Sequence, residues 1–450
     1  MRSNIFFLLF TGLLLFSQCS RSPEMPESYF EARIQVTDVI DSTGNASGFE
    51  FMLYSQATET SSRDTLFIQK TDSTGFLAGN IRFQNPGAYP LQISRDGEAI
   101  LSMRVLLAEQ DSIRFTGQFP DIQESLKIDS REQRAVEVFD RVDAGFTRTR
   151  RFIAVGAIAD SLILEELSKW AKLYEQVADE YPGTFAASFA LEASVQILSD
   201  INPNDMLRVI DKGLVQNQSL GLALTYGKDF KARSKGLSGG MAYLDSLKAL
   251  AETEDQLRAI EQMVVELYYD SLLVSEGRAA LQKFKRQFED EEELSYWYKN
   301  MRFELEDLAP GTPVPAFEFL STEGDTVNQE TIKGNLTLLE FTLMGNGLYQ
   351  EQYDQLTVSY QLFADSGLSM YTMAFDESST TILAFFEERD RYWSLAEPPS
   401  MDRKRLLEDF NVQYYPTRVL INSDGTIIRK FIGEELDDLI PYITAHLATN

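Results

Sequence analysis

From residue 29 to about residue 129, apolar and polar positions alternate along the chain with a period of two. Runs of this kind, such as Phe49–Tyr54 and Tyr89–Ile93, are separated by turn-forming sequences that include Pro86-Gly87 and Asp96-Gly97. Alternation places one face of a strand against a core, and glycine and proline end the strands. About seven short strands at this spacing predict an N-terminal antiparallel β-sandwich over residues 29–129.

From residue 130 to about residue 308, apolar residues recur at steps of three and four, which is typical of helices. Pro182-Gly183-Thr184 ends one helix, and Thr184 is suited to cap the next, over Phe185–Leu198. Gly236–Gly240 predicts a further break between helices. We therefore expect an α-helical hairpin region over residues 130–308, loosely similar to tetratricopeptide arrays but without a regular repeat.

The last part of the chain, residues 309–450, alternates between strand and helix patterns. Leu336–Phe341 and Leu368–Phe375 are continuous apolar runs, as expected of strands that are buried on both faces. Helical patterns follow each run, and a turn at Asn422–Gly425 joins two later strands. This order predicts a C-terminal α/β fold. The other expected elements are helices at Tyr349–Phe363, Ser379–Arg389, Asp402–Phe410 and Glu434–Leu447, and strands at Arg418–Ile421 and Thr426–Phe431.

The N-terminus has the pattern of a secretion signal. Arg2 precedes the apolar run Ile5–Phe16, whose 12 residues are too few to cross ~30 Å of hydrocarbon as a helix. The run leads into Cys19, and this segment resembles a bacterial lipobox, with Gln18 where a small residue is usual. The resemblance implies that residues 1–18 are a lipoprotein signal peptide and that Cys19 is lipidated. The alternative is a plain signal peptide that is cut elsewhere. Residues 19–28 suit a short tether.

Composition excludes several classes of function. The 450 residues include 69 acidic and 41 basic ones, a net charge of −28, with one cysteine and one histidine. A four-ligand Cys/His zinc site and an intrachain disulfide are impossible with these counts. The acidity argues against binding to nucleic acid, which requires clustered Lys and Arg. We expect no metal and no cofactor.

Two segments of the α/β region resemble a known family. Gly334–Phe341 and the stretch from Tyr415-Pro416-Thr417 to Gly425 are similar to the TlpA-like branch of the thioredoxin and peroxiredoxin superfamily. The resemblance implies a thioredoxin-like fold with a Cys-x-x-Cys site after the first strand. Asn346 and Tyr349 stand at the two cysteine positions, so thiol–disulfide exchange is not expected.

In that family, the proline that corresponds to Pro416 is cis and faces the active site. It exposes a backbone edge that pairs with extended substrate chains, and Tyr415 and Thr417 would flank the same groove. The sequence leaves open whether this groove still binds peptide or is retained only for the fold. Asp376-Glu377, just after the second apolar run, lies near the presumed groove and is interpreted as a turn or a helix cap.

The β-region resembles the small β-domain of unknown function found in Bacteroidota thioredoxin-like lipoproteins, on Lys70–Gly75 and Pro86–Leu91. Together these resemblances predict a protein anchored by lipid in the cell envelope, on the periplasmic side of the outer membrane. Its expected role is to bind or scaffold an envelope protein or peptide. One alternative is a pseudoenzyme or regulator in a thiol-disulfide or peroxide-handling system of redox homeostasis. Another is a carboxylate-dependent enzyme of unknown class.

Overall fold

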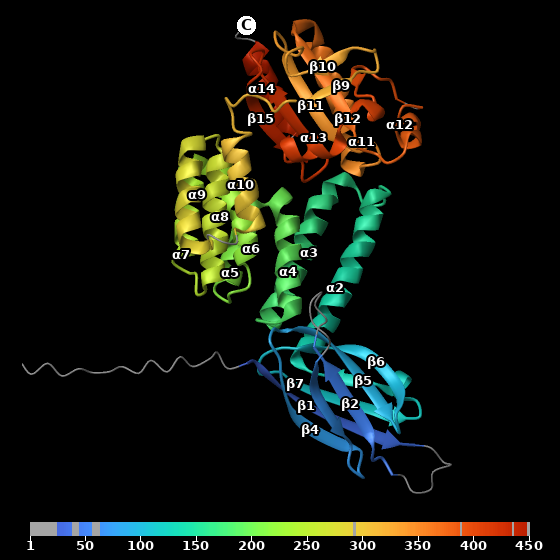
Figure 1. The fold of residues 1–450 in the computed structure, drawn as a ribbon. Helices are drawn as coiled ribbons and strands as arrows, with labels where there is room; N and C mark the ends of the chain where they lie inside the picture. Colours follow the sequence, from blue (N-terminus) through green and yellow to red (C-terminus); the bar gives the residue numbers. More distant parts are fainter. Residues whose placement is uncertain are drawn as a thin grey trace, which may run out of the picture. The chain divides into compact units, whose positions relative to one another are not determined.

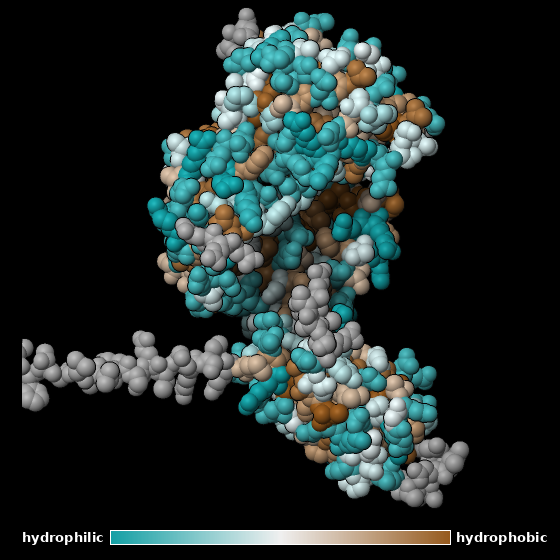
Figure 2. Space-filling model, in the orientation of Figure 1, coloured by the Kyte–Doolittle hydropathy of each residue, from teal (hydrophilic) through white to brown (hydrophobic). Residues whose placement is uncertain are grey.

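The computed structural model describes residues 25–37, 45–55, 64–290, 294–387, 389–433 and 436–447. The chain divides into two compact units, Met1–Tyr226 (unit 1) and Gly227–Asn450 (unit 2) (Figure 1). The predicted signal peptide, Cys19 and most of the tether lie outside the described residues. Within the ranges that are described, no helix is long and apolar enough to span a membrane. The surface seen in Figure 2 is mostly hydrophilic, in keeping with the charged composition.

Unit 1 begins with two four-stranded sheets that share one hydrophobic core. The strand orders are β4-β1-β7-β8 and β3-β2-β5-β6. Phe51 of the second sheet lies between Phe30 and Phe115 of the first, with ring centroids 5.9 and 5.3 Å away. The strands are β1 (Glu27–Val36), β2 (Phe49–Tyr54), β3 (Thr65–Lys70), β4 (Phe76–Arg82), β5 (Gly87–Arg95), β6 (Glu98–Leu107), β7 (Ser112–Phe119) and β8 (Lys127–Asp129), with a short helix α1 (Ile122–Ser125) before β8.

Two details differ from the sequence-based prediction. The sheets are not purely antiparallel, because β1 and β7 run parallel, with Phe30 opposite Ile113. Parallel neighbours need a long crossover, and here the chain passes through β2–β6 between them. Strand β1 also begins before the expected end of the tether at residue 28, since it includes Glu27 and Ser28. The hydroxyl of the buried Ser28 donates to the carbonyl oxygen of Ala108 at 2.5 Å.

The remainder of unit 1 is helical. Thr184 caps α4, as the sequence predicts, by accepting the N–H of Ala187 at 3.2 Å. Ser130 caps the long helix α2 in the same way, through the N–H of Gln133. The elements are α2 (Arg131–Ala154), α3 (Asp160–Glu180), α4 (Phe185–Ile201), α5 (Pro203–Leu214), α6 (Leu220–Leu222) and the π-helical turn η1 (Ala223–Gly227).

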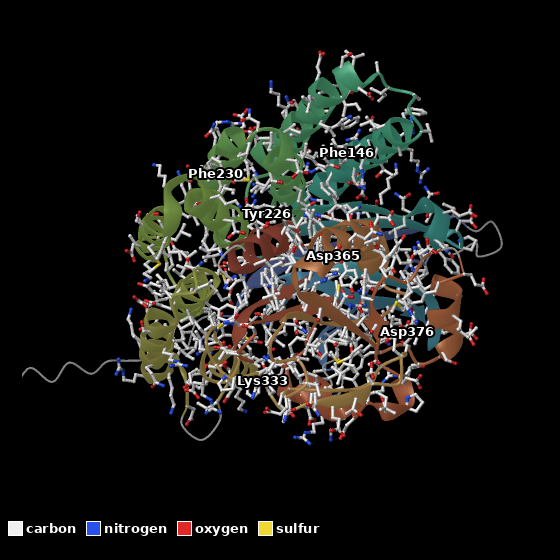
Figure 3. All side chains as sticks on the ribbon, turned by 90° about the horizontal axis from the view of Figure 1, so that it is seen from above. Phe146, Tyr226, Phe230, Lys333, Asp365 and Asp376 are labelled. Carbon is white, nitrogen blue, oxygen red and sulfur yellow. The ribbon has the colours of Figure 1, made fainter. Side chains whose placement is uncertain are left out.

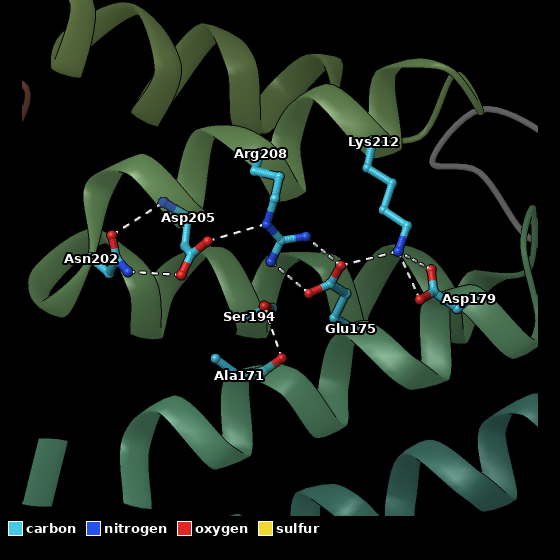
Figure 4. A network of polar contacts seen from close by, with 8 residues as sticks. All are labelled: Ala171, Glu175, Asp179, Ser194, Asn202, Asp205, Arg208 and Lys212. Atoms are coloured by element: carbon cyan, nitrogen blue, oxygen red, sulfur yellow. Dashed lines mark hydrogen bonds and ion pairs between the residues drawn. The ribbon is translucent and has the colours of Figure 1, made fainter. Parts of the chain in front are cut away.

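A network of ion pairs joins α3 to α5 (Figure 4). The Glu175 carboxylate accepts two hydrogen bonds from the Arg208 guanidinium, at 2.7 and 2.9 Å, and a third from Lys212 at 3.0 Å. Hydrogen bonding from Arg208 lowers the pKa of Glu175 to about 2, although partial burial acts in the opposite direction. Bidentate pairs of this kind fix both distance and orientation, so the network sets the spacing of the two helices.

Unit 2 begins with helices α7 (Lys228–Lys248), α8 (Glu254–Asp270), α9 (Val274–Phe288) and α10 (Tyr296–Glu306). The predicted break at Gly236–Gly240 is a kink inside α7, where Gly236 has φ 70° and ψ −174°. Glycine adopts this backbone conformation without steric cost. Helix α10 begins at Tyr296, because Ser295 caps it through the N–H of Tyr298.

The α/β part of unit 2 contains a five-stranded sheet in the order β13-β12-β11-β14-β15. The central strand β11 is parallel to β12 and antiparallel to β14. Leu338 packs on the face covered by α11 and α14, whereas Leu339 packs on the face covered by α13 and the β9–β10 hairpin. The elements are β9 (Glu318–Leu320), β10 (Thr326–Asn328), β11 (Leu336–Thr342), α11 (Gly347–Phe363), the 3-10 turn η2 (Ala364–Ser366), β12 (Leu368–Ala374), α12 (Ser379–Phe385), β13 (Ser394–Leu395), the 3-10 turn η3 (Pro398–Ser400), α13 (Arg403–Asp409), β14 (Thr417–Ile421), β15 (Ile427–Ile432) and α14 (Leu436–Leu447).

A buried carboxylate connects the helices of unit 2 to this sheet. Glu304 of α10 pairs with Lys430 of β15, and Asn411, which follows α13, donates to the same carboxylate at 2.9 Å. Tyr269 of α8 donates to the other carboxylate oxygen at 3.0 Å. Burial lowers the pKa of Lys430, while the charge of Glu304 opposes that change. The pair therefore neutralises a lysine that is almost entirely removed from water.

Candidate functional site

The turn between β11 and α11 is held by a carboxylate from the next strand. Asp376, directly after β12, accepts the N–H groups of Met344 and Gly345 at 2.7 and 3.2 Å. Its own carbonyl oxygen accepts a hydrogen bond from Arg403 at 3.0 Å. Asp376 is buried and is labelled in Figure 3. Both of its carboxylate oxygens are therefore committed to the turn, which agrees with the interpretation of this residue as part of a turn.

Asn346, at the first cysteine position of the resemblance, is the N-cap of α11. Its side-chain oxygen accepts the N–H of Tyr349 at 3.0 Å. Its side-chain nitrogen points the other way and lies 3.4 Å from the carbonyl oxygen of Tyr415. The Tyr415–Pro416 peptide bond is cis. One amide thus contacts both the start of the helix and the loop before β14, and it has no nucleophilic atom.

Tyr349, at the second cysteine position, lies in the first turn of α11 and is fully buried. Its ring packs against Tyr353 and Phe385, with centroids 6.0 and 5.7 Å away. Its hydroxyl has no hydrogen-bond partner among the described residues. Burial raises the pKa of Tyr349 well above its ordinary value, and the negative charge of Glu340 adds to this effect. The side chain is therefore a neutral part of the core that no substrate reaches.

A buried ion pair crosses the sheet below this site. Glu340 of β11 and Arg418 of β14 are opposite each other, and the Arg418 Nε donates to Glu340 at 2.8 Å. Thr372 of β12 donates to the second Glu340 oxygen at 2.7 Å, and Gln352 of α11 accepts from Arg418 at 2.9 Å. Trp393 completes the chain by donating to the Thr372 hydroxyl. Sequence reasoning missed this network, for which the signal was a charged residue inside each of two apolar strand patterns.

The carboxylates nearest the turn are poorly suited to act as general bases. Glu340 is fully buried, and its oxygens accept hydrogen bonds from Arg418 and Thr372. Asp376 is also buried and holds the N–H groups of the turn. A general base must come within hydrogen-bond reach of the substrate proton. No group of three or more His, Cys, Asp or Glu in the described part of the chain could hold a metal ion.

The loop around Pro416 offers a partly open backbone edge. The N–H of Tyr415 has no hydrogen-bond partner among the described residues, and its ring stacks on Phe375 at 5.9 Å. Tyr414 is 69% exposed. Thr417, which was expected to flank the groove, is buried, and its hydroxyl donates to the carbonyl oxygen of Tyr414 at 2.7 Å. The edge that remains is therefore formed by the exposed Tyr414 and the half-buried Tyr415.

No protein-family model matches the chain. Among curated proteins, the thiol-disulfide oxidoreductase ResA of Bacillus cereus is 22% identical over 139 residues, which is 31% of this chain and 78% of that protein. ResA of Bacillus anthracis is 21% identical over the same length. Among solved structures, the thioredoxin domain of a thiol-disulfide oxidoreductase from Bacteroides vulgatus is 25% identical, with a TM-score of 0.28 over 31% of this chain and 98% of that chain. A putative thiol:disulfide interchange protein DsbE from Chlorobium tepidum is 18% identical, with a TM-score of 0.28 over 31% of this chain and 97% of that chain.

A thioredoxin-like fold of the kind found in thiol-disulfide oxidoreductases covers about 31% of the chain.

Proposed function

We propose that the protein is anchored by lipid at Cys19 in the cell envelope, on the periplasmic side of the outer membrane, and binds a peptide or protein there without catalysing thiol–disulfide exchange. The observation that carries the proposal is the placement of Asn346 and Tyr349. The first is committed to capping α11 and to the Tyr415 loop, and the second is buried. Exchange requires an attacking thiolate and a second thiol that resolves the mixed disulfide. The chain holds one cysteine, Cys19.

The binding role is supported by the edge at Tyr415. An unpaired backbone N–H beside exposed aromatic surface suits an extended peptide, which pairs through its main chain and seats alternate side chains. Tyr414 supplies a large apolar ring with a polar tip, a combination that is common at binding surfaces.

The first experiment tests catalysis. The full chain with Cys19→Ser is assayed for reduction of insulin by dithiothreitol, beside the dithiothreitol-only reaction. We expect the two rates to be equal, because this chain contains no thiol. A rate above that of dithiothreitol alone would show that exchange proceeds by a route that this proposal excludes.

The second experiment tests binding at the edge. The amide resonance of Tyr415 is followed by NMR while a library of extended hexapeptides is added, together with a matched library whose backbone nitrogens are methylated. Strand-like pairing predicts a shift of the Tyr415 amide with the first library and a much weaker one with the second. Equal shifts, or none, would contradict the peptide-binding role.

The third experiment tests the anchor. Cells that express the wild-type chain or Cys19→Ala are labelled with radioactive palmitate. Labelling of the wild type alone is expected, and equal labelling of both chains would contradict lipidation at Cys19.

A second candidate follows from the relatives, whose names are those of thiol-disulfide oxidoreductases. In this alternative, the chain is a pseudoenzyme that regulates an active oxidoreductase of the same envelope. A chain of this kind would bind the active enzyme differently in its oxidised and reduced forms. Equal affinity for both forms would count against it.

A further inference from the structure

The end of the α2–α3 hairpin in unit 1 is an exposed apolar tip. Residues 152–159 read Phe-Ile-Ala-Val-Gly-Ala-Ile-Ala, without a polar side chain, and connect α2 to α3. Phe152 and Val155 on one side are 49% and 76% exposed, and Leu162 and Leu164 on the other are 49% and 62% exposed. Four large apolar side chains thus face water at the end of one hairpin, and their burial elsewhere would be favourable.

Three arginines stand immediately below this tip. The last turns of α2 contain Arg148, Arg150 and Arg151 in a stretch of four residues, and all three side chains are exposed. None of the three forms an ion pair with another described residue; Arg150 lies over the ring of Phe146, 5.9 Å from its centroid. Cations at a helix C-terminus also stabilise the helix itself, but that effect does not explain the exposed apolar tip beside them.

From these features we infer that the tip inserts into the interface of an anionic lipid bilayer. Arg151 precedes Val155 by four residues, about 6 Å along a helix axis. Apolar faces of membrane-surface helices lie ~5–10 Å deep, at the headgroup and acyl-chain boundary. With Val155 at that depth, the Arg148, Arg150 and Arg151 guanidiniums lie at the level of the lipid phosphates, which they bind through paired N–H groups.

The shape of the tip favours lipid over a protein partner. Its exposed side chains belong to two helices at the end of a hairpin, and the connection includes Gly156, with φ 67°. A deformable bilayer can cover the apolar side chains of both helices at once, whereas a protein partner would need a matching socket. Asp160 and Glu165 of α3 are exposed close to the tip and weaken the attraction, whereas Glu166 is paired with Lys169 at 3.1 Å. The remaining negative charge of the chain is screened beyond ~8 Å at physiological salt.

The experiment places a fluorescent reporter at the tip of the full chain with Cys19→Ser, so that no lipid anchor contributes. Val155→Cys is labelled with an environment-sensitive NBD group. The matched control is Val215→Cys, because Val215 is 89% exposed at the end of α5, where the nearby Lys212 is paired with Glu175 and Asp179. Vesicles contain equal phosphatidylglycerol and phosphatidylcholine, or phosphatidylcholine alone.

We expect the NBD emission at residue 155 to shift to the blue and to increase several-fold with the anionic vesicles, and to remain unchanged at residue 215. The triple variant Arg148→Gln/Arg150→Gln/Arg151→Gln should need about tenfold more lipid or more, because each basic side chain near an anionic surface contributes roughly a fivefold gain in affinity. All variants retain residues 1–24, so any binding by that apolar segment is common to them. Circular dichroism confirms that the triple variant is folded.

Three outcomes would overturn the inference. The first is no change at residue 155, and the second is an equal change with neutral vesicles. The third is emission that is already shifted to the blue without vesicles, which would mean that the chain itself or a second copy covers the tip. Lipidation of Cys19 plays no part in this test, so its result is independent of the proposed anchor.

Discussion

The side-chain nitrogen of Asn346 lies 3.4 Å from the carbonyl oxygen of Tyr415, so the residue at the start of α11 contacts the loop that carries the cis proline. The other end of the same amide caps the helix at the N–H of Tyr349. Helix capping and loop contact are therefore combined in a single side chain, and the two contributions are separable by substitution.

Asn346→Ala should lower the stability of unit 2 by about 0.5–2 kcal/mol, the usual cost of losing an N-cap. Asn346→Asp keeps the capping oxygen and places a negative charge at the helix N-terminus, but it sets a carboxylate oxygen against the carbonyl oxygen of Tyr415. It should therefore keep the cap, lose the loop contact, and fall between the wild type and Asn346→Ala. Amide hydrogen exchange at Tyr349 measures the cap directly. Equal exchange rates in the two variants would show that the cap contributes little.

The Glu340–Arg418 pair predicts strongly non-additive substitutions. Arg418→Met leaves an uncompensated buried carboxylate, which costs about 3–5 kcal/mol. The double variant Glu340→Leu/Arg418→Met removes both charges and should be more stable than Arg418→Met. Urea unfolding, followed through the fluorescence of Trp393 near the network, compares these variants in a double-mutant cycle. Additive losses would contradict the coupling.

Tyr349→Phe should change stability at pH 7 by less than about 1 kcal/mol, because the hydroxyl that it removes has no partner among the described residues. The pKa of Tyr349 is raised above its ordinary value of 10.0. Stability from its neutral form is therefore fully present below pH 10 and is lost as the pH rises towards the folded value. Tyr349→Phe should unfold less readily at alkaline pH. For the comparison at pH 7, Tyr353→Phe is the matched control. It should lower stability more than Tyr349→Phe, since it removes a 2.7 Å hydrogen bond to the carbonyl oxygen of Asp390.

Unit 1 should lose stability at acidic pH because of the ion pairs of Glu175. Its pKa is lowered from 4.5 to about 2, chiefly by hydrogen bonding to Arg208. The stability that it contributes is present above pH 4.5 and is lost as the pH falls through 4.5 towards 2. Glu175→Gln should therefore lower the melting temperature at pH 7 and reduce the further loss between pH 5 and about pH 2. If the variant and the wild type lost the same stability between pH 5 and about pH 2, the ion pairs of Glu175 would contribute little to the stability of unit 1.

Gly75, between β3 and β4, leaves no room for a side chain. It has φ 78°, and a Cβ added there would lie 1.9 Å from the carbonyl oxygen of Ile34. Gly75→Ala should cost more than about 3 kcal/mol, because the backbone itself must move. Gly48→Ala is the control: its φ is 85°, but nothing lies within 4 Å of the added atom, so only the conformational cost of about 1–2 kcal/mol remains. Calorimetry of both variants therefore separates the cost of the steric contact from the cost of the backbone conformation.

The predictable parts of the structure are those with local signals. The apolar run at Leu336–Phe341 predicts a buried strand, and the capping residue Thr184 predicts a helix start. Both signals lie in residues that are close together in the sequence. The parallel pairing of β1 with β7 joins segments about 80 residues apart and leaves no local trace. Glu340 and Arg418 are 78 residues apart, and each resembles a solvent-facing residue until the sheet places them opposite each other.

At the candidate site, the sequence identifies which residues replace the cysteines but not what they do. An asparagine before a helix is a natural N-cap, whereas its second contact, with Tyr415, depends on a loop that is 69 residues away. The burial of Thr417 likewise follows from the sheet, in which all of β14 is enclosed.

The contact between Glu304 and Lys430 determines where this chain tolerates being shortened. A fragment that starts at residue 309, the boundary that the sequence suggests, would retain Lys430 and lose the carboxylate that neutralises it. The lysine would then have to release its proton or draw water into the sheet. Expression of the thioredoxin-like part by itself should therefore yield a poorly folded product, whereas a fragment that begins ahead of α7 keeps both members of the pair.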